Sequence, residues 1–311
     1  MVASGPVSMQ TYMFDAIGTS WIIELYDAVT AHDAAVLERT IHKRIDAFDK
    51  VYSRFRPDSL VTEMSRHAGD FMLPDDAAPL LTLYRQLYDL TEGVVTPLIG
   101  QTLSDAGYDA AYSLRLKQSL AAVPAWDEVM TYEYPVLRLK RPALLDFGAA
   151  GKGYLADLVG QVIERSGCTG YCINAGGDIV YKNTASSSAT PGQGKGTLDV
   201  ALEHPTDPSM AVGVAHLSGG SICGSSGNRR AWSTYHHIIH PSKLVSPQHI
   251  QAVWVTAASG LVADGLATAL YFASPEAFVE VFAFENAIVT TDGAIQKSDG
   301  FPATFYYNVT K

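Results

Sequence analysis

Hydrophobic and polar positions along this chain follow two different periods, and each period predicts one kind of element. Alternation between Tyr12 and Tyr26, on either side of a Gly18-Thr19 corner, predicts two strands. Ala35 to Tyr52 and Pro74 to Thr91 repeat apolar residues three and four positions apart, which predicts two amphipathic helices. Between these helices, Ser59 is expected to cap a second, short helix.

The second half of the chain continues to interleave helices and strands. Aromatic alternation over Pro124 to Lys140 predicts a hairpin, and Ala143 to Leu145 predicts an apolar strand that runs into Asp146. A helical pattern follows a glycine-rich corner, and a further helix is predicted at Val262 to Phe272. Strands or strand-like alternation are predicted at Tyr171 to Asn174, Leu198 to Leu202, Ala211 to Leu217, His236 to Ile239, Val253 to Val255, Phe278 to Phe282, Ala287 to Thr290 and Phe301 to Val309.

This order of elements favours an α+β fold. Hairpin-like neighbours outnumber parallel crossovers, so the sheets are expected to be mixed or antiparallel. The 311 residues contain no tandem repeat and no interior linker. We therefore expect a flexible N-terminus at 1–12 and one large domain at 13–311, built as two intimately packed α/β lobes. The Ser, Gly and Pro-rich stretch 184–196 is expected to be a mobile loop.

Composition and charge exclude several classes of protein. The chain is 47% hydrophobic and 17% charged, as in compact globular proteins. Its net charge of -10, with scattered Lys and Arg, argues against binding to nucleic acid. Cys168, Cys172 and Cys223 form no Cys-x-x-Cys pair and are expected to be buried free thiols. No signal peptide or membrane span is recognisable, so a cytoplasmic location is expected.

The corner between Asp146 and Gly153 is a candidate phosphate site. Gly148, Gly151 and Gly153 permit a sharp turn and a close backbone approach to a ligand. The helix that follows presents unpaired N–H groups and a partial positive charge, and Lys152 lies beside them. Asp146 is a candidate acceptor for an adenine or ribose donor. The alternative is a tight strand-to-helix connection with a solvated lysine.

Asp264 and Thr268 are a candidate pair of metal ligands. At a spacing of four on a helix, both side chains lie on one face. A carboxylate and a hydroxyl are hard oxygen donors of the kind that Mg²⁺ prefers. The alternative is an N-capping aspartate with an unrelated threonine.

The segment from Trp232 to Pro241 concentrates three histidines. His236 and His240 have the helical spacing of a zinc site, but Ile238-Ile239 and Pro241 favour an extended segment. In a strand, His237 and Ile239 face one way, and one histidine is a candidate acid, base or phosphate donor. The alternative is a strand with satisfied polar residues. Upstream, Gly219 to Arg230 is either an anion site or a turn with surface charges.

Taken in order, these segments resemble the ApbE-type FAD:protein FMN transferases over nearly the whole chain. The segments that carry the resemblance are Ile17 to Thr19, Tyr52 to Ser59, Thr91 to Pro97, Asp146 to Tyr154, Asn174 to Ile179, Ser226-Gly227, His237 to Ile239 and Asp264 to Leu270. The resemblance implies a T-fold-like α+β domain that cleaves FAD at its pyrophosphate. It further implies that FMN is attached by a phosphodiester to a Ser or Thr of an acceptor flavoprotein, with release of AMP.

The resemblance also implies roles for individual residues. Asp264 and Thr268 would bind Mg²⁺ (one or two ions) by side chain, together with the carbonyl of Ala149. Independently of the resemblance, a Ser or Thr hydroxyl is a poor nucleophile near neutral pH and needs a base, for which Asp264 and His237 are both candidates. The residues that would line the FAD site are Ile17, Phe55, Val94, Val95, Thr96, Asp146, Lys152 and Ile239.

Two segments depart from the family pattern. Val94-Val95-Thr96 replaces the usual Ala-Phe-Asp, and His240-Pro241 follows where Asp-Pro is usual. The departures leave two alternatives to transfer. One is a protein that binds FAD without transferring FMN, and the other is a metal-dependent FAD pyrophosphatase in which water replaces the acceptor hydroxyl.

Overall fold

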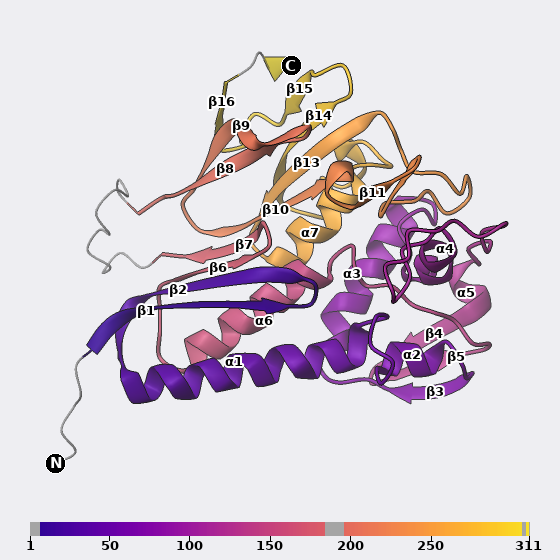
Figure 1. Ribbon diagram of the computed structural model, residues 1–311, viewed down its shortest axis with the longest axis horizontal. Coiled ribbons are helices and arrows are strands. Elements are labelled where there is room, and N and C mark those ends of the chain that lie inside the picture. Colours follow the sequence, from indigo (N-terminus) through magenta and orange to yellow (C-terminus); the bar gives the residue numbers. More distant parts are fainter. Residues whose placement is uncertain (1–6, 184–195, 307–308, 311) are drawn as a thin grey trace.

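A computed structural model describes residues 7–183, 196–306 and 309–310, and its centre is one large sheet (Figure 1). The strand order is β1-β2-β6-β7-β10-β13-β14-β15-β17, and all neighbours are antiparallel except β15 and β17. These strands are β1 Val7–Ala16, β2 Thr19–Thr30, β6 Tyr171–Ala175, β7 Asp178–Lys182, β10 Gly220–Ser226, β13 Ile250–Ala257, β14 Phe284–Thr290, β15 Ile295–Lys297 and β17 Val309–Thr310.

Helices cover one face of this sheet and a smaller sheet covers part of the other. The helices are α1 Ala31–Tyr52, α2 Leu60–Met64, α3 Ala77–Leu90, α4 Gly100–Asp105, α5 Trp126–Val129, α6 Gly151–Arg165 and α7 Gly260–Ala269, with 3-10 turns η1 Pro97–Ile99, η2 Gly227–Arg230 and η3 Pro275–Ala277. The smaller sheet has the order β16-β9-β8, formed by β16 Ala303–Phe305, β9 Asp207–Leu217 and β8 Leu198–His204. Two further short sheets are β3-β5-β4 (Gly69–Met72, Val136–Leu139, Met130–Glu133) and β11-β12 (Ala231–Trp232, Tyr235–His236).

The alternation of side chains in the large sheet gives each face its own core. Ile173, Val253 and Val255 point to the helices, whereas Cys172, Ala252 and Trp254 point to the β8–β9–β16 sheet. The α+β class with mainly antiparallel sheets is therefore confirmed, and the three cysteines are buried free thiols as expected. No helix in the described parts of the chain is long and apolar enough to cross a bilayer.

The helices pack as their sequence pattern predicts, but α1 starts at Ala31, α3 at Ala77 and α7 at Gly260 rather than at Ala35, Pro74 and Val262. In α1, Leu37, Ile41, Ile45 and Phe48 recur every three or four residues and are buried. Thr30 caps this helix by accepting from the Asp33 N–H at 3.1 Å. Ser59 caps α2 through the Thr62 N–H at 3.0 Å, as expected from the sequence.

Several predicted boundaries are wrong. Val7 already pairs with Thr30, so the flexible N-terminus cannot extend to residue 12, and residues 1–6 lie outside the described residues. Of the predicted loop 184–196, only Gly196 is described. Phe301 to Val309 is two short strands rather than one, and Phe278 to Phe282 forms turns, because the Phe282 N–H bonds locally to the Phe278 carbonyl at 2.9 Å.

Two predicted strands near the candidate site are also wrong. Ala143 to Leu145 joins no sheet, because the Ala143 N–H donates to the carbonyl of Met64 and the Asp146 N–H to that of Pro97. His236 to Ile239 pairs only at His236, because the His236 ring nitrogen accepts the Ile238 N–H at 3.3 Å. Conversely, β10 was not predicted, because its small residues resemble a turn; in the structure it lies between β7 and β13.

The start of α6 lies against the start of α7 at two glycines. A Cβ on Gly153 would stand 2.2 Å from the Gly260 carbonyl oxygen and 2.7 Å from the Asp264 Cβ. We predict that Gly153→Ala lowers the free energy of unfolding by about 1–3 kcal/mol, because backbone must move to admit the methyl group. Urea denaturation measures the loss. Gly151→Ala is the matched control, since its Cβ would meet nothing closer than 4.0 Å; equal effects of the two changes would contradict the prediction.

Candidate functional site

A cavity of about 630 Å³ opens where the corner before α6, the second half of α7, the end of β10 and the segment after β12 meet. Every residue to which the family resemblance or the need for a base gave a role lines this cavity, whereas His236 and His240 do not. The residues that line it are Ile17, Phe55, Val94, Val95, Thr96, Asp146, Ala149, Lys152, His237, Ile239, Asp264 and Thr268. The structure thus brings together residues that lie as far apart in the chain as 17 and 268.

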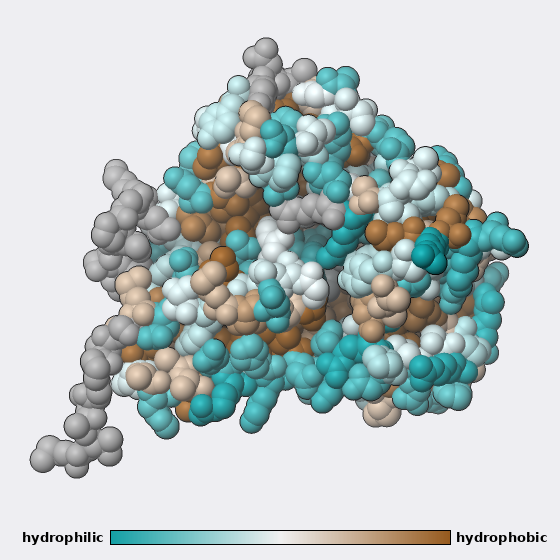
Figure 2. Space-filling view, in the orientation of Figure 1, coloured by the Kyte–Doolittle hydropathy of each residue, from teal (hydrophilic) through white to brown (hydrophobic). Residues whose placement is uncertain are grey.

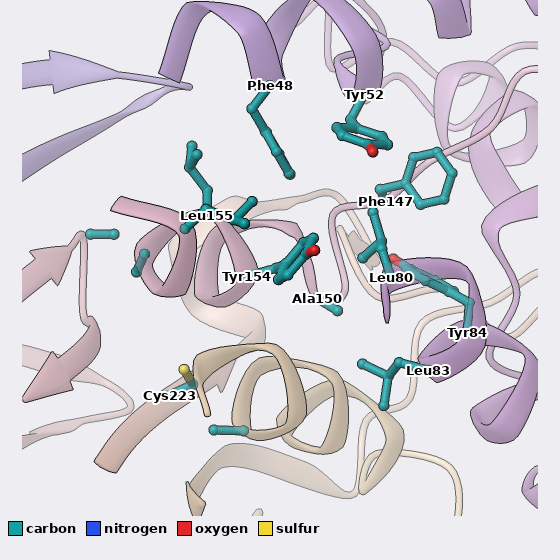
Figure 3. Close-up of a cluster of buried hydrophobic side chains, with 14 of the residues drawn as sticks. Phe48, Tyr52, Leu80, Leu83, Tyr84, Phe147, Ala150, Tyr154, Leu155 and Cys223 are labelled. Carbon is teal, nitrogen blue, oxygen red and sulfur yellow. The ribbon is translucent and has the colours of Figure 1, made fainter. Parts of the chain in front are cut away.

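The corner from Asp146 to Gly153 is held in the core by Phe147. Its ring packs edge-on against Tyr52 of α1 and Tyr84 of α3, at centroid distances of 5.5 and 5.4 Å (Figure 3). The Ala149 N–H also donates to the Tyr84 hydroxyl at 3.2 Å. The backbone that faces the cavity is therefore positioned from behind by buried aromatic rings.

The corner is also bonded directly to α7. The Gly153 N–H donates to Asp264 Oδ2 at 2.9 Å. In return, Asp157 of α6 accepts the Gly260 and Leu261 N–H groups at 2.8 and 2.9 Å, and so caps α7. The start of α6, with its partial positive charge, therefore lies at the cavity, and α7 reaches the cavity with Asp264 and Thr268.

Lys152 lies between two buried carboxylates. Its ammonium pairs with Asp178 at the start of β7 and stands 3.5 Å from Asp264 Oδ1. Asp178 and Asp264 are each only 2% exposed. Burial disfavours the Lys152 ammonium, but Asp178 and Asp264 outweigh burial and raise its pKa. Lys152 is therefore a fixed cation rather than a solvated surface lysine.

Two carboxylates against one ammonium leave this end of the cavity short of positive charge. Burial, followed by the charge of Asp178, raises the pKa of Asp264 to about 7. Oxygen donors surround the same point: Thr268 Oγ1 lies 3.4 Å from the Ala149 carbonyl oxygen and 3.5 Å from Ser225 Oγ. A carboxylate, hydroxyls and a carbonyl match the donors that a hard divalent cation such as Mg²⁺ takes, with water filling its other positions.

The described residues contain no cluster of three or more His, Cys, Asp or Glu suited to a metal ion. In particular, the zinc interpretation of His236 and His240 is not supported. His236 Nε2 bonds to the Pro247 carbonyl at 2.9 Å, and His240 Nδ1 accepts the Ser242 N–H at 3.2 Å. Both rings have structural roles.

The other end of the cavity is aromatic and contains arginine. Arg54, 6% exposed, pairs with Asp146 and donates to the Tyr108 carbonyl at 2.7 Å. Its guanidinium lies 4.2 Å from the Phe55 ring centroid and 4.8 Å from that of Tyr108. Phe55 also stacks on Tyr112 at 5.2 Å with 16° between the rings. Flat aromatic faces and cations thus lie side by side.

His237 is a neutral imidazole in this cavity. Burial, followed by the nearby Arg230, lowers its pKa well below 6.5. Its Nδ1 is buried and has no hydrogen-bond partner among the described residues. A neutral ring with an unpaired nitrogen can act as a base, and its lowered pKa makes it a weaker base than a free imidazole.

The family model described as the ApbE family matches residues 17–289, most of the chain. This chain belongs to the ApbE family. The FAD:protein FMN transferase of Klebsiella pneumoniae (strain 342) is 24% identical over 92% of this chain and 84% of that protein. That of Salmonella typhimurium (strain LT2) is 25% identical over 88% of this chain and 81% of its own length.

Solved ApbE structures share the fold. The flavin transferase ApbE from Vibrio cholerae superposes with a TM-score of 0.73 at 19% identity, covering 94% of this chain and 97% of that one. The ApbE protein from Thermotoga maritima gives a TM-score of 0.79 at 18% identity with the same coverage of both chains. The expected ApbE-like fold is therefore confirmed.

Sequence reasoning missed several residues that line the cavity of this ApbE-family chain. Asp178 was quoted only as part of a motif, although its position after Gly176-Gly177 at a hairpin turn is a signal for an exposed or functional carboxylate. Arg54 lies within the Tyr52 to Ser59 segment but received no role. Tyr108 and Tyr112 come from a segment with no recognisable pattern, and Ser225 lies in the candidate anion segment Gly219 to Arg230 but received no role of its own.

Two of the predicted FAD-site residues, Thr96 and Asp146, already make hydrogen bonds within the protein. Thr96 Oγ1 accepts the Leu98 N–H at 3.2 Å and so caps η1. Asp146 accepts from Arg54 and from the Gly148 N–H at 2.8 Å, so both carboxylate oxygens have a protein partner. Ile17 adopts a φ of 44°, an unusual conformation for a β-branched residue, in the turn before Gly18.

Proposed function

We propose that this protein is a Mg²⁺-dependent FAD:protein FMN transferase. The acceptor is a flavoprotein that presents a Ser or Thr hydroxyl. The hydroxyl oxygen bonds to the phosphorus of the FMN half of FAD, the bond from that phosphorus to the bridging oxygen breaks, and AMP leaves. The hydroxyl proton goes to a base on the enzyme. FMN is then attached to the acceptor through a phosphodiester.

One observation carries the proposal: the corner at Asp146 to Gly153 and the helix with Asp264 and Thr268 meet in a single cavity. Cavities of a few hundred cubic ångströms are typical for cofactor-sized ligands, and the 630 Å³ here falls in that range. Phosphoryl transfer depends on positioning and charge neutralisation more than on covalent chemistry by the protein. The names of the relatives from Klebsiella and Salmonella agree with this activity.

The metal would be held by the Asp264 carboxylate, the Thr268 hydroxyl and the Ala149 carbonyl. When bound, Mg²⁺ neutralises the pyrophosphate charge and polarises the phosphoryl group. Lys152 adds a positive charge that Asp178 holds in place, and the N-terminus of α6 adds a partial one. These groups are fixed before the reaction, so they need little reorganisation as charge develops.

The flavin and adenine ends would be bound by the aromatic and apolar part of the cavity. Phe55, Tyr108 and Tyr112 offer ring faces, while Ile17, Ile239 and the Val94 to Thr96 turn supply apolar contacts. Asp146 keeps accepting capacity on its oxygens and remains a candidate partner for an adenine or ribose donor. Arg54 fixes the orientation of that carboxylate.

His237 is the better candidate for the base. Both oxygens of Asp264 already have partners, Gly153 N–H on one and Lys152 near the other, and the same carboxylate would bind the metal. His237 is neutral and its Nδ1 is unpaired among the described residues. It can therefore take the hydroxyl proton without leaving another interaction.

The test is incubation of the purified protein with FAD, Mg²⁺ and candidate flavoprotein acceptors. Intact-mass analysis of the acceptor and chromatography of the nucleotides give the readout. Acceptor that carries FMN, with one AMP released for each FMN attached, is the expected result. Free FMN plus AMP would show a pyrophosphatase instead, and bound but unchanged FAD would show a binding protein; either outcome overturns the proposal.

A further inference from the structure

The charged side chains that line the cavity described above, the first cavity, are not all paired. They are four cations and four carboxylates: Arg54, Arg56, Lys152 and Arg230, and Asp49, Asp146, Asp178 and Asp264. Three ion pairs join most of them, namely Arg54 with Asp146, Arg56 with Asp49 and Lys152 with Asp178. Asp264 is left for the proposed metal ion, and Arg230 has no carboxylate partner in the described part of the chain. One cationic side chain in this cavity is therefore available to an anion.

A second cavity, also of about 630 Å³, does not suit an anion. It lies on the other face of the large sheet, and Figure 2 shows apolar side chains gathered there between the β8–β9 and β1–β2 hairpins labelled in Figure 1. Glu24, Asp199 and Glu203 contribute carboxylates to its lining, whereas no Lys or Arg among the residues with a described placement lines it. The phosphates of FAD are therefore expected in the first cavity, where Arg230 lies.

Arg230 lies beside His237 because a short hairpin joins them. Ala231 pairs with His236 in β11 and β12, and the His237 N–H donates to the Arg230 carbonyl at 3.2 Å. Residues opposite each other in an antiparallel pair have Cβ atoms about 4.5–5.5 Å apart and point to the same side. Both side chains line the first cavity. Burial and then the Arg230 charge lower the pKa of His237, as expected for neighbours.

Aromatic rings hold the Arg230 guanidinium in place. Its Cζ lies 5.7 Å from the centroid of the Tyr108 ring. Tyr108 stacks on Trp232 at 6.1 Å with 26° between the rings, and Trp232 Nε1 donates to the Ala106 carbonyl at 2.8 Å. A guanidinium over an aromatic face still has N–H donors at its edge, and these match the oxygens of a phosphate.

The position of Arg230 next to His237 decides which phosphate it can reach. A base must lie about 2.6–3.2 Å from the hydroxyl whose proton it takes. That hydroxyl oxygen must in turn approach the phosphorus to about 3–3.5 Å before the new bond forms. The phosphoryl group beside His237 is therefore the one being transferred, on the FMN half of FAD. Its non-bridging oxygens carry the negative charge that a guanidinium binds.

We propose that Arg230 is a catalytic residue that binds the non-bridging oxygens of the phosphoryl group being transferred. Its N–H groups donate to these oxygens while the acceptor hydroxyl oxygen bonds to the FMN phosphorus. The bond from that phosphorus to the bridging oxygen breaks, AMP leaves with the bonding electron pair, and the hydroxyl proton passes to His237. The guanidinium keeps all its protons throughout. The inference rests on the proposed function and adds one residue to its mechanism.

The first experiment removes the guanidinium. Arg230→Gln should lower the single-turnover rate of FMN transfer to a flavoprotein acceptor by about a hundredfold or more, because a fixed charge-stabilising donor is lost. FAD affinity, measured by fluorescence titration, should fall by less than about tenfold, because the interaction is strongest in the transition state. Arg230→Lys keeps the charge without the planar fork and should be intermediate. Arg66→Gln is the matched control, since Arg66 is exposed and lines neither cavity. An unchanged rate in Arg230→Gln, or a loss confined to FAD affinity, overturns the inference.

Chemical rescue separates a catalytic role from a structural one. Millimolar guanidinium chloride should restore part of the transfer rate of Arg230→Ala, whereas sodium chloride at the same ionic strength should not. The same addition should leave Arg66→Ala unchanged. A urea midpoint like that of wild type shows that Arg230→Ala is folded. Absence of rescue in a folded Arg230→Ala protein counts against direct contact with the phosphoryl group and overturns the inference.

A double variant tests whether Arg230 acts only through His237. In a His237→Ala background, Arg230→Gln should still slow transfer by about the factor that it causes in wild type, because the two side chains act on different atoms. No further loss in that background would show that Arg230 only influences His237, and the inference would be wrong. If wild type transfers FMN and Arg230→Gln does so equally well, the role of Arg230 fails and the proposed function stands. If wild type gives no acceptor FMN, the proposed function itself fails.

Discussion

Asp264→Ala is expected to reduce FMN transfer by about a hundredfold to a thousandfold or more, the scale seen when one preorganised charge-stabilising group is removed. The carboxylate is the one charged group among the three proposed metal ligands, so its loss should also raise the Mg²⁺ concentration needed for the remaining activity. Steady-state transfer measured across a Mg²⁺ titration gives both quantities. Wild-type activity in this variant would refute the metal assignment.

Stability measurements separate loss of metal binding from loss of fold. Because the folded state raises the pKa of Asp264 from 3.8 to about 7, it holds this proton more tightly than the unfolded chain does. The free energy of unfolding of the metal-free protein should therefore fall as pH rises from about 4 to 7. Asp264→Ala should flatten this slope, and Mg²⁺ should raise the Tm of wild type but not of the variant. Asp264→Asn, which keeps an oxygen for the Gly153 N–H, is the conservative control.

His237→Ala is expected to slow FMN transfer by about a hundredfold to ten-thousandfold, the usual contribution of a positioned base. FAD affinity should change little, because the proposed role concerns the acceptor proton. Single-turnover transfer and FAD titration separate the two effects. If Asp264 were the base instead, His237→Ala would leave the single-turnover rate near that of wild type.

The pH profile adds a second readout for His237. Burial and Arg230 hold its pKa well below 6.5, so the ring is already deprotonated at neutral pH. The transfer rate of wild type at saturating Mg²⁺ should therefore be level above about pH 6.5 and fall only in more acidic solution. A rate that instead climbs steeply between pH 7 and 9 would contradict the assignment.

The sequence predicted the long elements because their apolar periods are regular. The apolar stripe of α1 and the alternation of β1 and β2 needed no tertiary context. Prediction from the sequence failed where local hydrogen bonds or adjacent strands decide the structure. Ala143 to Leu145 is apolar, but the Ala143 N–H bonds to Met64 and the N–H of the following Asp146 bonds to Pro97, rather than to a strand. The reverse holds for β10, whose glycines and serines have low strand propensity but which is held in place by strands on both sides.

The candidate site shows the same division. Lys152, Asp264 and Thr268 were identified from residue type and spacing, and they do line one cavity. Whether they bind FAD and Mg²⁺ remains a prediction. Asp178 and Arg54 could not be assigned from spacing, because their partners Lys152 and Asp146 lie 26 and 92 residues away in the chain. Only the folded structure brings the two members of each pair together.

The backbone contact between α6 and α7 has a consequence for how substrates are taken up. Gly153 and Gly260 touch, and Asp157 ties the helices together from the other side. These contacts between α6 and α7 fix the distance between Ala149 and Thr268 before any nucleotide or cation binds. Association should cost little conformational entropy, FAD and cation should bind in either order, and amide exchange along both helices should stay slow whether or not a ligand is present.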